Sequence, residues 1–259
     1  MAAIASRKNK LVQHWRDLSL DGKARKKAHA AMLEGPHLVT AALNAGVPVR
    51  TLILSESGAE KAEHASAVRH FGKQPVMVSD GVFKAISSTE TPAGIAAEIE
   101  IPKEEPDLAT SAGCVFLESV QDPGNVGGIL RSAAAFGIHD AVLGRGCADP
   151  WSPKALRAAM GAHFSMRIAD DADLEKVVGA FGGTLVCTAP REGTPIAQAE
   201  LPAYIGWIFG TEGKGVTRSL AARAALKVTI PMAGLAESLN VGAAAAICFY
   251  EASRRKSRP

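Results

Sequence analysis

Short apolar runs alternate with helical patterns in the second half of the chain, and this rhythm predicts parallel β-strands connected by helices. The uninterrupted apolar run at 114–120 has the character of a strand that is buried on both faces. A helical pattern follows at 126–136 and ends at Gly137. Further strands are predicted at 141–143, 184–188, 207–209 and 228–230, and further helices at 153–160, 173–181, 216–224 and 239–254. We therefore expect an α/β domain built on a parallel sheet in residues 113–259.

The first half shows the same alternation on a smaller scale. A helix is predicted at 20–34, because Ala, Lys and Arg dominate that stretch. Helices are also predicted at 36–44, 60–71 and 81–86, and strands at 49–54, 76–78 and 94–101. These elements predict a smaller α/β domain at 30–101, preceded by a basic arm at 1–29 and followed by a polar, proline-bracketed linker at 102–112.

The charge of the chain is distributed unevenly. Its net charge is only +3, yet residues 1–30 carry eight Lys or Arg against two Asp, and the last seven residues carry four Lys or Arg. Basic termini on an acidic body are typical of contact with a polyanion, although two solvated termini would look the same. The Lys-rich continuation of the N-terminus, without a Ser-rich character, disfavours an organelle transit peptide. No apolar run reaches the roughly 18 residues of a membrane helix, so no membrane contact is expected.

Several common kinds of site are disfavoured by the motifs that the sequence lacks. The four cysteines are widely spaced and lie mostly in apolar runs, which favours reduced thiols and a cytoplasmic protein. No H-E-x-x-H or C-x-x-C motif occurs, so no metal is expected. The glycines at 124–128 match neither a dinucleotide-binding fingerprint nor a P-loop. His139 and His163 are isolated and are expected to be structural.

Three stretches combine an apolar strand with a loop rich in Gly, Pro, Asn, Ser and Glu, and they lie at 118–131, 208–216 and 230–240. Loops of this kind lie at the carboxyl edge of a parallel sheet, where ligands bind and where helix N-termini offer free amide groups. Their candidate functional side chains are Asn125, Arg131, Glu212, Ser238 and Asn240. Each of the uncharged ones, taken singly, also fits a helix cap or a first-turn position, and Glu212 fits a turn. Asn125 and Arg131 lie six residues apart, about 240° around a helix, so they converge only if Asn125 precedes the helix.

These three stretches resemble, in order and spacing, the three signature motifs of the SpoU (TrmH-like) family of RNA ribose 2′-O-methyltransferases. The resemblance implies a catalytic domain with a deep C-terminal trefoil knot, which works as a homodimer and uses S-adenosylmethionine. A knot violates the usual rules of chain connection and would not be predicted from pattern alone. The predicted fold is thus an α/β chain in which a knotted parallel-sheet methyltransferase domain follows a smaller α/β RNA-binding domain.

The resemblance also implies roles for individual residues. Backbone groups near Gly210, Ile230 and Leu239 would hold the adenine and methionine portions of the cofactor, with Thr188 and Met232 nearby. Arg131 takes the position of the essential arginine of the family. Because a guanidinium hardly loses a proton, we expect it to grip RNA phosphate and stabilise negative charge, oriented by the other four candidate residues.

The substrate is expected to be RNA, most plausibly large-subunit ribosomal RNA. Glu34-Gly35 and the segment 87–95 resemble the accessory RNA-binding domain of the ribosomal-RNA members of the family. Two alternatives stay open, namely methylation of transfer RNA and a non-catalytic role in ribosome assembly. A basic helix that includes Pro153, Lys154 and Arg157 is a further candidate for contact with phosphate, and a solvated face explains it nearly as well. The small side chains of Ala244 and Ala245 lead us to expect the dimer contact on the helix at 239–254.

Overall fold

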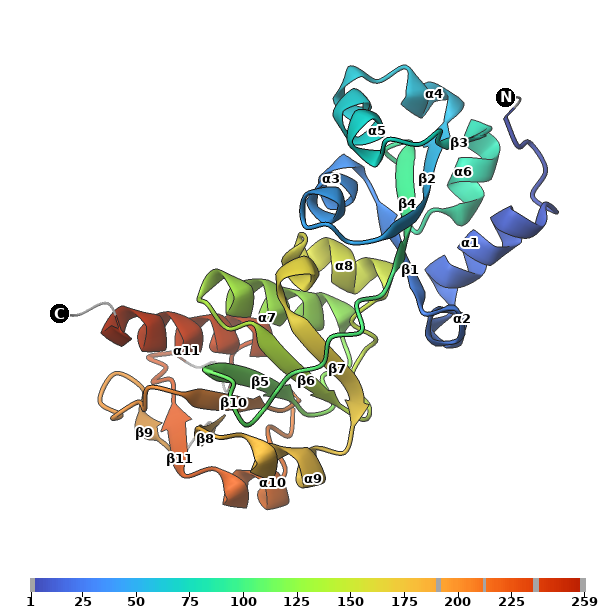
Figure 1. Ribbon diagram of the computed structural model, residues 1–259. Coiled ribbons are helices and arrows are strands. Elements are labelled where there is room, and N and C mark those ends of the chain that lie inside the picture. The colour runs from blue at the N-terminus through green and yellow to red at the C-terminus, as the bar shows by residue number, and fades with distance from the viewer. Residues whose placement is uncertain (1–2, 190–191, 212, 235–237, 257–259) are drawn as a thin grey trace. The chain divides into compact units, whose positions relative to one another are not determined.

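The computed structural model describes residues 3–189, 192–211, 213–234 and 238–256, and its chain forms two compact units (Figure 1). Unit 1 contains the residues up to Lys103 together with Asp149–Phe164, and unit 2 contains Glu104–Ala148 together with the residues from Ser165 onward. A segment from within the predicted second domain therefore folds with the first.

Unit 1 is built on a four-stranded mixed sheet with the strand order β1-β4-β2-β3. Strands β1 and β2 run antiparallel to β4, whereas β3 runs parallel to β2. The strands are β1 (Ala30–Glu34), β2 (Val49–Ser55), β3 (Val76–Val78) and β4 (Ile95–Glu100). The helices are α1 (Lys10–Leu20), α2 (Gly22–Ala28), α3 (Pro36–Asn44), α4 (Glu56–Ala59), α5 (Ala65–Phe71), α6 (Asp80–Ile86) and α8 (Pro153–Ala159), with the short 3₁₀ helices η1 (Ala62–His64) and η2 (Ala162–Ser165).

The N-terminal segment belongs to the hydrophobic core of unit 1. On α1 the side chains of Val12, Trp15 and Leu18 are buried, at a spacing of three residues that places them on one helix face. The Trp15 indole N–H also donates to Glu98 Oε2 at 3.0 Å. Asn9 and Asp21 cap α1 and α2, so both helices begin where a side-chain oxygen accepts a backbone N–H.

The prediction of a helix at 20–34 is wrong for residues 30–34. Residues 30–34 form β1, which pairs with β4 from Ala30 opposite Glu100 to Glu34 opposite Ala96. Ala30–Leu33 are buried on both faces of the sheet, and His29 ends α2 in a left-handed conformation with φ of 48°. Burial between β4 and the helices overrides the helix propensity of the alanines.

Unit 2 is built on a seven-stranded sheet with the order β7-β6-β5-β10-β8-β11-β9, in which every described pairing is parallel. Its strands are β5 (Gly113–Leu117), β6 (Asp140–Gly144), β7 (Arg167–Ala172), β8 (Thr184–Thr188), β9 (Thr194–Pro195), β10 (Ile205–Phe209) and β11 (Leu226–Thr229). Its helices are α7 (Pro123–Ala135), α9 (Leu174–Val177), η3 (Val178–Ala180), α10 (Arg218–Arg223) and α11 (Val241–Lys256). The predicted parallel-sheet α/β fold is thereby confirmed.

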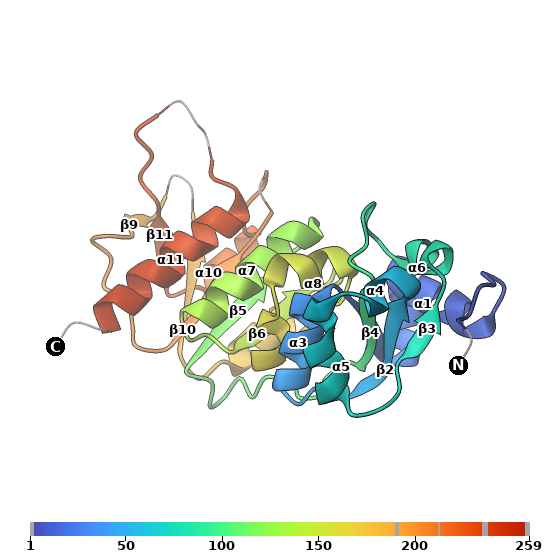
Figure 2. The same ribbon diagram turned by 90° about the horizontal axis from the view of Figure 1, so that it is seen from above.

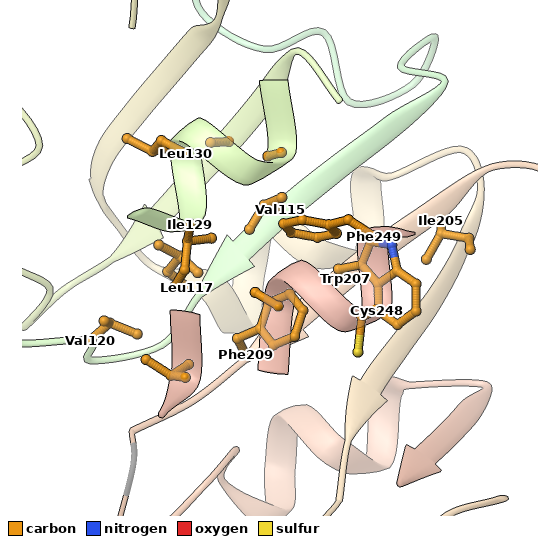
Figure 3. Packing of buried hydrophobic residues seen from close by; sticks show 14 of the residues in the cluster. Val115, Leu117, Val120, Ile129, Leu130, Ile205, Trp207, Phe209, Cys248 and Phe249 are labelled. Atoms are coloured by element: carbon orange, nitrogen blue, oxygen red, sulfur yellow. The ribbon is translucent and has the colours of Figure 1, made fainter. Parts of the chain in front are cut away.

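Helices cover both faces of this sheet. Helices α7 and α11 lie side by side on one face, and α9 and α10 lie on the other (Figures 1 and 2). Alternate residues of β5 serve the two layers, since Val115 and Leu117 pack with α7 and α11 while Cys114 and Phe116 pack with α9 and α10. On the first face, Trp207 and Phe209 of β10 surround Phe249 of α11, with the Phe209 and Phe249 rings 5.6 Å apart and nearly perpendicular (Figure 3).

No helix among the described residues is long and apolar enough to cross a membrane. The same residues contain no group of three His, Cys, Asp or Glu side chains that could hold a metal ion. His163 is buried in unit 1, where its Nε2 lies 2.7 Å from the Pro150 carbonyl, and His139 Nδ1 lies 3.0 Å from the Ser165 carbonyl in unit 2. The trefoil knot stays a prediction.

Candidate functional site

The three motif stretches meet at the carboxyl edge of the unit 2 sheet. Strands β5, β10, β8 and β11 are neighbours, and because they are parallel their C-terminal ends lie at the same edge. The loop after β5 leads into α7, the loop after β10 leads into α10, and the chain after β11 leads into α11. The sheet therefore gathers stretches whose first residues, Glu118, Ile208 and Ile230, are far apart in sequence.

A cavity of about 560 Å³ opens at this edge. Its walls come from the chain after β8, the loop after β10, the chain after β11 and the first turn of α11, and they include Thr188, Gly210, Ile230, Met232 and Leu239. Those are the five residues for which the sequence predicts a contact with S-adenosylmethionine. The volume lies within the range of about 300–1,000 Å³ that is usual for small-molecule sites. The lining combines apolar side chains such as Val228 and Ile230 with loop glycines, hydroxyl groups and the charged Glu192 and Lys214.

The loop after β10 folds back tightly over its own start. Gly215 N donates to the Thr211 carbonyl at 2.8 Å, and Lys214 N donates to Thr211 Oγ1 at 3.2 Å. A Cβ atom at Gly210 would lie only 2.0 Å from the Gly215 carbonyl oxygen, so this position admits no larger residue. The glycines predicted as part of the site thus allow the loop to form one wall of the cavity.

Side-chain hydrogen bonds connect the first stretch to the second and to the third. Glu118 accepts from the backbone N–H and the hydroxyl of Thr217, at 2.7 and 2.8 Å. Asn240 Nδ2 donates to Asn125 Oδ1 at 2.9 Å. Asn240 Oδ1 also accepts from the N–H groups of Gly242 and Ala243, at 2.9 and 3.2 Å, and so caps α11. Asn240 is therefore both a helix cap and a link between α11 and α7.

Asn125 and Arg131 are not brought together in the way that convergence would require. Asn125 lies within α7, whose N-cap is Asp122, and not in the loop before it. Six helical residues then separate it from Arg131, which leaves their directions about 120° apart. Arg131 is exposed and is not among the residues that line the cavity. Asn125 accepts from Asn240, and its joint action with Arg131 stays a prediction.

Two predicted side chains, Ser238 and Glu212, remain, and Cys187, which was not predicted, precedes the cavity residue Thr188 in sequence. Ser238 lines the cavity and is exposed, and Asn240 takes the capping role that the sequence also allowed for Ser238. Glu212 lies outside the described residues. The Cys187 thiol precedes Thr188 on β8, and burial raises its pKa, so it stays protonated and is no candidate nucleophile.

In unit 1, the two segments that resemble an RNA-binding domain are in direct contact. The Glu34 carboxylate accepts from the Ser87 hydroxyl and from Ser88 N, both at 2.8 Å. Arg157 of α8 donates to the Ser88 hydroxyl at 2.5 Å. Arg157 of the predicted basic helix therefore contacts the loop at 87–89, and a contact of this helix with RNA stays a prediction.

Sequence reasoning missed some residues of the site. Glu118 and Thr217 lie at the ends of recognised stretches, but nothing in their own spacing indicated that they would bond. Glu192 and Lys214 also line the cavity, and neither had been singled out. Their position in the sequence could have indicated them, because each follows a predicted strand by only a few residues.

Comparison with known proteins identifies the family and the two domains of the chain. The SpoU rRNA Methylase family matches residues 113–250, and an MRM3-like substrate binding domain matches residues 9–97. The chain belongs to the SpoU rRNA methylase family, and the resemblance of its three motifs is confirmed.

Individual relatives cover almost the whole chain. It is 35% identical to the 23S rRNA (guanosine(2553)-2′-O)-methyltransferase RlmP of Bacillus subtilis, over 96% of this chain and 98% of that protein. The AdoMet-bound rRNA methyltransferase from Sinorhizobium meliloti has a TM-score of 0.84 and 28% identity, covering 100% of this chain and 99% of that one. The SpoU methyltransferase AviRb from Streptomyces viridochromogenes, in complex with AdoMet, has a TM-score of 0.85 and 25% identity, covering 96% and 98%.

Proposed function

We propose that this protein transfers a methyl group from S-adenosylmethionine to a ribose 2′-hydroxyl of large-subunit ribosomal RNA. The observation that carries the proposal is the cavity at the carboxyl edge of the unit 2 sheet. Its lining includes all five residues that motif position assigns to the cofactor. A relative that aligns over nearly the full length is named as a 23S rRNA 2′-O-methyltransferase, which supports both the reaction and the class of RNA.

The cofactor would lie against the loop after β10 and the first turn of α11. Backbone groups near Gly210, Ile230 and Leu239 are proposed to hold its adenine and methionine portions, and Thr188 and Met232 to complete the pocket. Bound S-adenosylmethionine supplies an electrophilic methyl group. The apolar side chains of the lining would keep water from competing with the ribose oxygen for that methyl.

The residues of the chain must then orient a weak nucleophile. The 2′-oxygen forms a bond to the methyl carbon as the carbon–sulfur bond breaks, and the hydroxyl proton is lost to solvent. We assign to Arg131 the grip on RNA phosphate and the stabilisation of negative charge on that oxygen, because its guanidinium is exposed and presents a fork of donors. Asn125, Glu212, Ser238 and Asn240 are proposed to orient the ribose and the arginine.

Unit 1 is the proposed RNA-binding part. The division that the sequence suggests is an arm at 1–29, a binding domain at 30–101, a linker at 102–112 and a catalytic domain at 113–259. In the structure α1, α2 and α8 pack with the proposed binding domain, so we extend it to include them. The match of residues 9–97 to an MRM3-like substrate binding domain supports this role.

A homodimer in the cytoplasm is proposed as the working form. We no longer place the dimer contact at Ala244 and Ala245. Ala245 is fully buried in the unit 2 core, and Ala244 lines the cavity. The outer face of α11 instead exposes Ala243, Ile247 and Tyr250, which follow one another at helical spacing. Tyr250 also contacts Phe136 of α7 with ring centroids 6.1 Å apart, so the apolar face extends over both helices.

Mapping 2′-O-methyl groups in total RNA from cells with and without the gene tests the proposed substrate. We expect one ribose methyl group to disappear from large-subunit rRNA when the gene is removed. Loss of a methyl group from transfer RNA would favour the alternative substrate. An unchanged map in every RNA class would favour a non-catalytic role in ribosome assembly.

A further inference from the structure

Glu118 holds both ends of the loop that forms one wall of the cavity. At the entrance of the loop, Glu118 N donates to the carbonyl of Phe209, the last residue of β10, at 2.8 Å. At the exit, the carboxylate accepts from Thr217 N at 2.7 Å and from Thr217 Oγ1 at 2.8 Å. A single half-buried residue at the end of β5 thus bridges the seven residues between Phe209 and Thr217.

Five described residues between these two attachment points line the cavity. Gly210, Thr211, Gly213, Lys214 and Gly215 are all lining residues. The described part of the loop is folded on itself through Thr211 and Gly215, so it behaves as a compact piece. Its placement over the sheet then depends on how its two ends are held.

Both bonds at the exit end on the charged carboxylate of Glu118. The Thr217 hydroxyl donates to Glu118 Oε1, and its oxygen lies 3.5 Å from Leu220 N at the start of α10. Both carboxylate oxygens therefore face donors, the hydroxyl and the N–H of the same residue. A glutamine could contact both groups only if the hydroxyl turned round to accept from its amide, and both bonds would then lose the charge of their acceptor.

We propose that Glu118 is a positioning residue for the cofactor pocket, which fixes the loop after β10 in the conformation that receives S-adenosylmethionine. This inference rests on the proposed function, since it takes the cavity to be the cofactor site. Glu118 acts through the loop and touches neither methyl donor nor ribose. Its loss weakens cofactor binding and raises the KM for the cofactor, while kcat at saturating cofactor changes little.

The test measures S-adenosylmethionine binding by titration calorimetry in the full-length protein. Glu118→Gln is expected to weaken binding about tenfold, the factor that corresponds to exchanging a hydrogen bond to a charged group for a neutral one. Thr217→Val removes the hydroxyl and should weaken binding in the same direction. Thr217→Ser keeps both donors and should restore wild-type affinity.

Asp107→Asn is the matched control, because Asp107 also accepts from a threonine hydroxyl and a backbone N–H but does not line the cavity. It should leave the affinity unchanged. If Glu118→Gln and Thr217→Val lower only the melting temperature and bind as tightly as wild type, Glu118 is merely structural and the inference is overturned. If Glu118→Gln fails to fold, Thr217→Val against Thr217→Ser decides by the same criterion. Failure of the wild type to bind would instead contradict the proposed function itself.

Discussion

At the scale of single residues, substitution of Arg131 should impair methyl transfer and leave cofactor binding intact. It lies exposed on α7 and does not line the cavity, whereas the proposed cofactor contacts lie after β8, β10 and β11. Arg131→Ala and Arg131→Lys should therefore bind S-adenosylmethionine with nearly wild-type affinity. Both should lose methyl transfer by on the order of 100-fold or more, since an ammonium offers no planar fork to phosphate.

Calorimetry together with a methyl-transfer assay on the same preparations checks this prediction. Near-normal turnover of Arg131→Lys would show that positive charge alone suffices. Loss of cofactor binding in Arg131→Ala would place the arginine in the pocket and contradict its assigned role.

The buried His163 predicts a pH dependence of stability. Burial lowers its pKa to about 4 from the ordinary 6.5, although its hydrogen bond to the Pro150 carbonyl opposes part of that change. The unfolded chain takes up the proton below about pH 6.5 and the folded chain only below about pH 4. This contribution to stability is therefore complete above pH 6.5 and is lost as the pH falls to 4, amounting to roughly 3 kcal/mol.

Urea unfolding of wild type and His163→Gln at pH 7.5 and pH 4.5 measures the effect. The substitution should flatten the loss of unfolding free energy across this interval. His37→Gln, on an exposed position of α3, is the control and should keep the wild-type slope. An unchanged slope in His163→Gln would assign the pH dependence to other groups.

Individual site residues were predictable where backbone position decides their role. Thr188, Gly210, Ile230, Met232 and Leu239 were expected from the family resemblance, and they line one cavity because the strands before them belong to one parallel sheet. The partners of Asn125 and Glu118 were not predictable, because each bond joins side chains about 100 residues apart whose directions depend on the packed helices.

At the scale of elements, the start of α11 depends on Asn240. Asn240→Ala removes the cap of α11 and the bond to Asn125, and should lower the free energy of unfolding by about 0.5–2 kcal/mol. Asn240→Asp keeps an acceptor for the helix N–H groups and should cost much less. Chemical denaturation compares the two variants, and equal losses would contradict the capping role.

The exposed face of α11 carries the proposed dimer contact. Ile247 is 38% exposed and Tyr250 55% exposed, although both are large and apolar. Ile247→Glu should yield a monomer in light scattering with an unchanged melting temperature, because the side chain contributes little to the core. Ala222→Glu, at an exposed position of α10, is the matched control and should stay dimeric. If Ile247→Glu stays dimeric, the dimer contact does not include this face of α11.

Prediction of elements failed where burial contradicts local composition. The alanines of β1 favour a helix by propensity, yet Ala30–Leu33 form a strand whose side chains are buried on both faces of the sheet. Strand β7 is an edge strand with exposed Asp170 and Asp171, so it shows no apolar pattern and was not predicted. The strands at the centre of the sheet, such as β5 and β10, are fully apolar and were found.

At the scale of the whole molecule, the two units do not correspond to continuous halves of the sequence. On α8 and just before it, Trp151, Ala155, Leu156 and Ala159 are buried within unit 1. The buried Arg25 guanidinium pairs with Asp149 at 2.7 Å and fastens the same segment to α2. A protein shortened to residues 113–259 should therefore bind S-adenosylmethionine but leave Asp149–Phe164 without its partners.

Hydrogen exchange checks this expectation. The amides of α8 should be protected in the full-length protein and exchange rapidly in the shortened one, while β5 and β10 stay protected in both. Protection of α8 in the shortened protein would contradict its assignment to unit 1. Sequence could not reveal this arrangement, because the helical pattern of α8 does not specify which sheet it covers.

The central claim is that the cavity and the three motifs together transfer a methyl group to a ribose 2′-oxygen. The most direct measurement incubates the purified full-length protein with S-adenosylmethionine and large-subunit rRNA from cells that lack the gene. The RNA is then digested to nucleosides, and the methylated product is identified by mass spectrometry. We expect the wild type to form a single 2′-O-methylribonucleoside and Arg131→Ala to form none. A methyl group on a base, or no methylated product from a protein that binds the cofactor, would contradict it.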